Sequence, residues 1–276
     1  MAETELKEMS FLDHLEDLRW LLIRITLAIS IVSCLSYFII DFIFENVIFA
    51  PLDPNFITYR KFCELTHYLN TDDGGMCVDK MPFIIQSTEL GSQFSIFLWT
   101  CISAGFILGF PYILWEIWKF ISPALYKKEK KNSFGFILSS SILFFLGVLF
   151  GYYLILPLSI NFFGSFNVST AIQNQFKVDN YIGMVKTSVI SCGIIFELPI
   201  IIYFLTKMGL VTAETLRIYR RYSIVIILIV AAIITPPDIL SQIIVSIPLL
   251  LLYELSIWIA VFVNRKQKGL EKGLKV

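Results

Sequence analysis

The chain has 276 residues, of which 57% are hydrophobic and 15% aromatic, and its formal net charge is zero. Its mean hydropathy is +0.75. One soluble core cannot bury that much apolar surface, whereas membrane spans of about 20 apolar residues accommodate it. The composition therefore excludes an ordinary soluble globular protein and predicts an integral membrane protein.

Charged residues divide the chain into six apolar segments, each of which predicts a transmembrane helix. In chain order the predicted spans are residues 20–44, 90–118, 133–158, 182–206, 222–237 and 239–263. The predicted fold class is therefore an all-α integral membrane protein with six transmembrane helices. We expect one transmembrane domain over residues 1–276, with an amphipathic N-terminus (1–19), an outer loop (45–89) and a C-terminal tail (264–276).

The basic residues predict the orientation of these helices. If both ends are cytosolic, the cytosolic segments hold 15 Lys and Arg residues and the outer segments hold 4. Lys and Arg concentrate on the cytosolic side of membrane proteins, so we predict that both termini are cytosolic. Losing one span would place basic loops on both sides, so the same count supports an even number of helices.

The fifth predicted span is short, because only 16 residues separate Arg221 from Asp238, and Pro236 and Pro237 end the helix. At about 1.5 Å per residue it covers about 24 Å, less than the hydrocarbon core of about 30 Å. Two explanations stay open: the bilayer thins locally, or neighbouring helices shield this one. We expect the sixth helix to be short as well.

Two pairs of glycines indicate where helices approach one another closely. Gly105 and Gly109 lie in the second predicted span, and Gly147 and Gly151 lie in the third. Small residues four positions apart let helix backbones come close in membranes, so we expect helix packing at both pairs.

The outer loop contains Cys63 and Cys77, on either side of a turn sequence at residues 72–75. In an oxidising compartment the two thiols could form a disulfide, and otherwise they stay free. None of the five cysteines belongs to a CxxC pair, so their spacing gives no metal-binding signature.

The common motifs of catalysis and nucleotide binding are absent. The chain has no GxxxxGK[ST], HExxH, GxSxG or GxGxxG sequence, and its only histidines are His14 and His67. We therefore expect no enzymatic activity, and no cofactor, metal ion or nucleic acid as a partner. Transport by this chain would draw energy from the proton-motive force or from partner binding.

The N-terminal region is acidic and amphipathic. Residues 10–13 have the pattern of a helix N-cap, and an apolar stripe follows them at helical spacing. The first twenty residues carry six acidic and two basic side chains. Such a helix is poorly suited to a surface of anionic lipid, and a cationic ligand would explain it. The alternative is a helix whose charges face solvent.

Glu197 lies in the fourth predicted span, ten residues before Lys207. A carboxylate at that depth is costly and usually faces a cavity, a partner or a cation. Lys186 shares roughly the same helix face but is about 16 Å away along the axis, so we expect another partner for Glu197. Glu254, in the sixth span, is more easily explained as a structural residue.

Several motifs occur together along the chain. They are HLEDLR at 14–19, APL at 50–52, FPYILWEIWKF at 110–120, SPALYKKEKK at 122–131, FELP at 196–199 and TPPDILSQ at 235–242. With them the sequence resembles TatC, the multi-spanning subunit of the twin-arginine protein translocase, over nearly its whole length. The six spans and cytosolic ends predicted above agree with that family.

The resemblance implies a receptor that binds the paired arginines of signal peptides on folded cargo. It assigns this role to carboxylates of the N-terminal region and the first cytosolic loop, where Glu129 and the aromatic Phe120 match. The family's N-terminal motif has Glu where this chain has Asp17, so both Asp17 and the preceding Glu16 are candidates, followed by Arg19. Carboxylates bind guanidinium groups through two parallel hydrogen bonds, which lysine cannot reproduce.

The resemblance also implies partners and structural positions. It assigns Glu197 to docking of TatA- and TatB-like single-span proteins, and it implies self-association within the membrane. The residues that match positions shaping loops and helix ends are Pro51, Pro111, Pro236, Pro237, Asp238 and Gln242.

Two other functions stay open from the sequence. A proton-coupled secondary transporter of a small solute would use Glu197 as its ion site; an inverted repeat with broken helices would favour it, and the sequence shows none. An intramembrane enzyme would need a catalytic pair, which the motifs do not provide. The possible disulfide and the absence of a transit-peptide pattern favour a bacterial inner membrane over an organelle membrane.

Overall fold

The computed structural model describes residues 11–69, 77, 81, 83–122, 133–169, 174–235 and 239–273. The chain divides into two compact units, which are described separately below. The first unit contains residues 1–39 and 99–141, and the second contains residues 40–98 and 142–276. Helices α4 and α5 each begin in one unit and end in the other. That residues 1–276 form one transmembrane domain stays a prediction.

The first unit consists of α1 (Phe11–Ser36) with the 3-10 turn that follows it, most of α4 (Ser92–Ile121) and the start of α5 (Ser133–Phe150). Gly105 brings α4 close to α1, since a Cβ atom there would lie only 2.9 Å from the Ile29 carbonyl oxygen. A Cβ on Gly109 would meet nothing within 4 Å. Of this glycine pair, only Gly105 therefore serves the predicted close packing.

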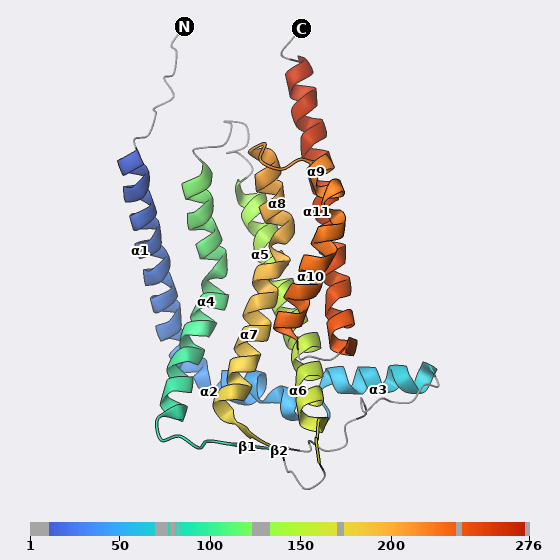
Figure 1. Cartoon of the computed structure of the whole chain (residues 1–276). Helices are drawn as coiled ribbons and strands as arrows, with labels where there is room; N and C mark the ends of the chain where they lie inside the picture. Colours follow the sequence, from blue (N-terminus) through green and yellow to red (C-terminus); the bar gives the residue numbers. More distant parts are fainter. Residues whose placement is uncertain are drawn as a thin grey trace. The chain divides into compact units, whose positions relative to one another are not determined.

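The described residues of the second unit form the other helices and two short strands. After α2 (Ile40–Phe42) and a π-helical turn (Ile43–Ile48), it includes α3 (Ile57–Leu69), β1 (Phe83–Gln86), a second π-helical turn (Gly151–Ile155), α6 (Leu156–Ser165), β2 (Asn174–Lys177), α7 (Val178–Phe196), α8 (Leu198–Lys207), α9 (Ala213–Ile218), α10 (Arg220–Ile234) and α11 (Ile239–Gly273). Within this unit α3 runs crosswise to α6 (Figure 1). Gly147 and Gly151 both face α7, where added Cβ atoms would lie 2.5 Å from the Cys192 carbonyl and 2.6 Å from the Ser188 carbonyl.

Tyrosine hydroxyls hold the irregular segment before α3 against the helices of the second unit. Tyr181 donates to the Ile48 carbonyl at 2.6 Å, and Tyr152 donates to the Val47 carbonyl at 2.8 Å. The buried Tyr59 hydroxyl lies 3.2 Å from the carbonyl oxygen of Pro51, which is itself buried in a 3-10 turn. These bonds give backbone carbonyls of the π-helical and 3-10 turns side-chain donors from other parts of the unit.

The two strands were not predicted from the sequence. β1 and β2 pair in parallel, with Phe83 opposite Asn174 and Gln86 opposite Lys177. Each strand has only four residues, and its partner lies far away in the sequence, so no local pattern marks it. A salt bridge of 3.0 Å between Lys177 and Glu89 follows the paired strands.

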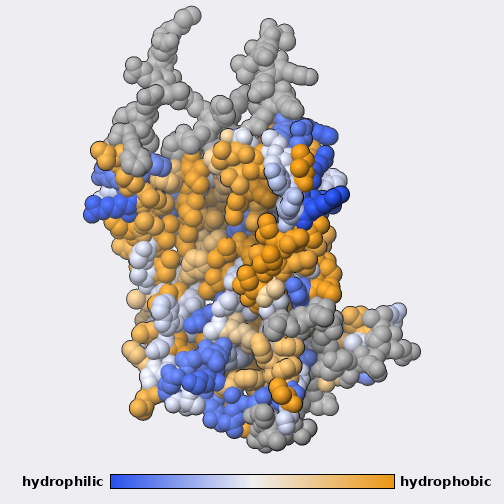
Figure 2. Space-filling view, in the orientation of Figure 1, coloured by the Kyte–Doolittle hydropathy of each residue, from blue (hydrophilic) through white to orange (hydrophobic). Residues whose placement is uncertain are grey.

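Five helical stretches among the described residues are long and apolar enough to cross a membrane: His14–Tyr68, Ser92–Ile121, Gly135–Ser165, Val178–Lys207 and Gln242–Arg265. Figure 2 shows extensive hydrophobic surface on the visible face. The predicted fifth span corresponds to α10, whose 15 residues reach about 22 Å, so it is short as expected. The count of six spans stays a prediction.

The expectation of a short sixth helix is wrong. α11 has 35 residues and continues well beyond its apolar part. Residues 265–268 are Arg, Lys, Gln and Lys, which all favour helix, so no helix-ending residue stands where the apolar segment stops. Pro248 lies inside α11 without ending it.

Candidate functional site

A small cavity opens between α1 and α4 in the first unit. Its volume is about 130 Å³, and it is lined by Asp17, Leu21, Arg24, Glu116, Lys119 and Phe120. The α1 residues are four and three positions apart, and on α4 Glu116 lies three and four positions before the other two, so the lining of each helix follows helical spacing. The structure thus brings together Asp17 and Phe120, two of the residues that the sequence predicts for signal-peptide binding.

Glu116 carries a nearly buried charge at this cavity. Its side chain is 8% exposed, and its Oε2 lies 3.4 Å from Nε of Arg24. Its Oε1 accepts a hydrogen bond of 3.1 Å from the Tyr112 hydroxyl. Arg24, whose side chain is 42% exposed, also donates from Nε to the Trp20 carbonyl at 3.2 Å. A buried carboxylate needs such donors because desolvation strongly disfavours an unpaired charge.

The aromatic wall of the cavity is supported from α1. The rings of His14 and Phe120 stack with centroids 4.7 Å apart and planes 23° apart. Glu16 and Arg19 are exposed and lie outside the cavity lining. Of the two candidate N-terminal carboxylates, Asp17 is therefore the one that faces the cavity.

Some predicted site residues have no described position. Glu129, Pro236, Pro237 and Asp238 lie outside the described residues. Gln242, which is described, donates from Nε2 to the Leu228 carbonyl at 3.3 Å and so links α11 to α10. The half-buried Pro111 lies inside α4.

Glu197 lies in the second unit, at the break between α7 and α8. The residue is buried, with 7% of its surface exposed. Its backbone carbonyl accepts hydrogen bonds of 3.0 Å from the amides of Ile200 and Ile201. Pro199 follows at the start of α8, where a missing N–H costs nothing. The structure thus buries the Glu197 residue between α7 and α8.

Glu254, which the sequence places inside the sixth predicted span, takes part in a salt bridge. Glu254 on α11 forms a salt bridge of 2.5 Å with Arg220 at the start of α10. Both side chains are partly exposed, at 36% and 55%. This contact agrees with the reading of Glu254 as a structural residue.

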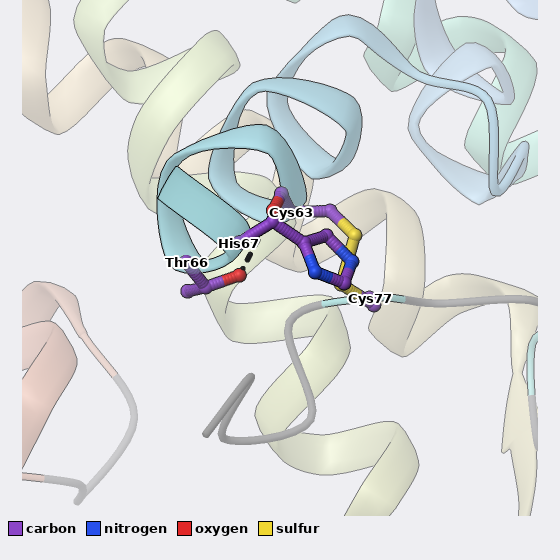
Figure 3. The surroundings of a disulfide bond; sticks show 4 residues. All are labelled: Cys63, Thr66, His67 and Cys77. Atoms are coloured by element: carbon purple, nitrogen blue, oxygen red, sulfur yellow. Dashed lines mark hydrogen bonds between the residues drawn. A yellow bond between two sulfur atoms is a disulfide. The ribbon is translucent and has the colours of Figure 1, made fainter. Parts of the chain in front are cut away.

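Cys63 and Cys77 form a disulfide in the structure, with Cα atoms 4.9 Å apart (Figure 3). His67 lies one helical turn after Cys63 on α3, and its Nε2 is 3.9 Å from Sγ of Cys77. The three potential ligand atoms lie within 4.8 Å of one another. A metal ion binds cysteine as the thiolate, and the disulfide leaves no thiolate at Cys63 or Cys77. While the disulfide is formed, His67 is therefore the only ligand that these three residues offer.

Sequence reasoning missed four residues of this site, namely Glu116, Tyr112, Lys119 and Arg24. The signal was present: Arg24 and Glu116 are opposite charges at the edges of two consecutive apolar segments. Charges in such positions commonly pair with one another. The sequence alone does not say that α1 and α4 are neighbours, so the pairing of Arg24 with Glu116 could not be predicted.

Comparisons with known proteins give the family. The family model described as Sec-independent protein translocase protein (TatC) matches residues 13–248. A TatC protein of Blattabacterium is 41% identical over 265 residues, covering 96% of this chain and all of the relative, and one of Aquifex aeolicus is 34% identical over 266 residues with the same coverage. A crystal structure described as twin arginine translocase receptor TatC matches with a TM-score of 0.68 and 33% identity, over 91% of this chain and 99% of that one. The chain therefore belongs to the TatC family and is a multi-pass membrane component of the Sec-independent protein translocase.

Proposed function

We propose that this chain is the receptor core of a twin-arginine export system, which binds the Arg-Arg signal peptide of folded cargo and recruits single-span subunits. The observation that carries the proposal is the cavity where Asp17 and Phe120 meet, in a chain of the TatC family. The solved relative is itself described as a twin arginine translocase receptor.

The chemistry of the cavity suits an arginine ligand. A carboxylate such as Asp17 can accept two parallel N–H groups from one guanidinium, and a neighbouring aromatic face such as Phe120 attracts the planar cation. Glu16 and Glu129 are the further carboxylates that we assign to this site, with Arg19 as part of the same motif. Lysine presents no planar fork, so an Arg-Arg leader should bind better than Lys-Lys.

In this proposal the chain crosses a bacterial inner membrane six times, with α10 as the short fifth span and both termini in the cytosol. The bias of Lys and Arg toward the predicted cytosolic segments supports this orientation. The side chains of Ile229 and Ile233 on α10, and of Trp258 and Phe262 on α11, are exposed and apolar, as expected for lipid or partner helices.

Glu197 is the residue that we assign to partner docking. Its carboxyl group is buried at the α7–α8 break, where a polar group on a TatA- or TatB-like helix could reach it only by packing against this unit. Polar contacts between helices in a membrane favour specific association. Copies of this chain are expected to associate in the same complex.

The decisive experiment is export of a folded reporter with a twin-arginine leader in cells that lack their own TatC. We expect this chain, expressed with its own single-span partners, to restore export of the Arg-Arg reporter. A Lys-Lys leader on the same reporter is the matched control and should stay in the cytosol. Equal export of both leaders, or of neither, would contradict the proposal.

A further inference from the structure

The cavity beside Asp17 and Phe120 contains a carboxylate that the predicted arginine site does not use. Glu116 lies at its wall, close to where a bound guanidinium would sit against Asp17 and Phe120. The charged side chains of the lining are Asp17 and Glu116, opposed by Arg24 and Lys119, so they balance. An incoming pair of arginines would leave this lining with excess positive charge unless a resident cation moves away.

Arg24 is the resident cation that can be replaced. Its contact with Glu116 runs through Nε at 3.4 Å, which is long for a charge-assisted hydrogen bond and does not use the two-pronged face of the guanidinium. Glu116 is almost fully buried and held by Tyr112, whereas 42% of the Arg24 side chain is exposed. Exchange therefore requires a movement of Arg24 toward solvent and little movement of Glu116.

We propose that Glu116 is a further acceptor for a signal-peptide arginine, and that Arg24 is its resting partner and gives way when the peptide binds. This inference rests on the proposed receptor function and adds a residue to its specificity. Glu116 has a guanidinium partner both before and after the exchange, so neither end state leaves a buried carboxylate without a cation. The incoming arginine gains a two-point contact in place of the single-point contact of Arg24.

The exchange predicts effects of opposite sign at the two residues. In full-length protein in detergent, Glu116→Gln should weaken binding of a labelled Arg-Arg signal peptide about tenfold or more, because a charge-assisted bond is lost. Arg24→Gln should tighten binding, because the competitor for Glu116 is gone. A purely structural ion pair between α1 and α4 would instead make both variants weaker.

Arg220→Gln is the matched control, since it removes one partner of the Arg220–Glu254 salt bridge in the other unit and should leave peptide affinity unchanged. Peptide-induced thermal stabilisation is the second readout: the peptide should raise the melting temperature of Arg24→Gln by more than that of the parent protein. This readout does not depend on Glu116→Gln folding well.

Failure of this inference can be separated from failure of the receptor function. If the parent protein binds Arg-Arg and Lys-Lys peptides equally, the receptor proposal is overturned. If it discriminates between them but Arg24→Gln binds more weakly or unchanged, or Glu116→Gln binds unchanged, the receptor proposal survives and the exchange is overturned.

Discussion

The hydroxyl of Tyr181 on α7 donates a hydrogen bond of 2.6 Å to the carbonyl of Ile48, which lies in the irregular segment after α2. Both residues are buried, so this bond satisfies a carbonyl that water does not reach. The bond ties the end of the π-helical turn (Ile43–Ile48) to α7.

Tyr181→Phe should therefore destabilise the protein by about 1–3 kcal/mol, the cost of leaving a buried acceptor unpaired. Thermal or denaturant unfolding in detergent measures the change. Tyr68→Phe is the matched control, because Tyr68 is 87% exposed and should tolerate loss of its hydroxyl. Equal effects of the two substitutions would contradict a special role for the Tyr181 bond.

Gly147→Ala should destabilise the packing of α5 against α7. The added Cβ would lie 2.5 Å from the Cys192 carbonyl and 2.8 Å from the Phe196 Cβ, so the helices must move apart. Gly183→Ala, on α7, meets nothing within 4 Å and should instead stabilise the helix by about 0.5–1 kcal/mol. Melting temperatures that shift in opposite directions would support this; a stabilised Gly147→Ala protein would count against it.

Replacing Cys63 and Cys77 by serine should lower the stability of the segment that contains α3. The disulfide closes a loop between positions 14 residues apart, for which chain entropy predicts about 3 kcal/mol. Mass spectrometry of the digested protein before and after reduction tests the bond itself: one linked peptide pair should separate into two thiol peptides. The Cys34→Ser variant, which removes a free cysteine, is the control and should leave this pair linked.

Glu197→Gln should reduce recovery of the single-span partners with the purified protein, while signal-peptide binding survives. The substitution keeps the size of the side chain and removes its charge, so the loss would report the carboxylate. Glu214→Gln, at an exposed position on α9, is a control that should keep full recovery. Unchanged partner recovery with Glu197→Gln would leave Glu197 as a structural residue.

Charge reversal at Glu129 should abolish crosslinking of a twin-arginine signal peptide, because a lysine there would repel the paired arginines. Asp17→Asn should weaken the same crosslink, whereas Glu16→Gln should have the smaller effect, since Asp17 lines the cavity and Glu16 does not. Crosslinking that persists with Glu129→Lys would remove Glu129 from the site, and the reverse order of Asp17 and Glu16 would make Glu16 the principal contact.

The helix positions were largely readable from the chain because hydropathy and charge are local properties. The predicted spans 90–118 and 182–206 correspond to α4 and to α7 with α8, within a few residues at each end. The short α10 followed from two charges and a pair of prolines. The length of the sixth helix was predicted wrongly. The apolar segment indicates only how much of a helix can lie in a membrane, whereas the helix itself continues as long as its residues favour helix.

Local sequence also carried the family motifs, and with them Asp17, Phe120 and Glu197 as candidates. It could not reveal the contact of Arg24 with Glu116, the pairing of β1 with β2, or the tyrosine bonds to Val47 and Ile48. Each of these joins segments that are distant in the chain, and each depends on how helices approach one another in space. Burial and hydrogen bonding across such contacts are properties of the packed molecule, so only the tertiary structure specifies them.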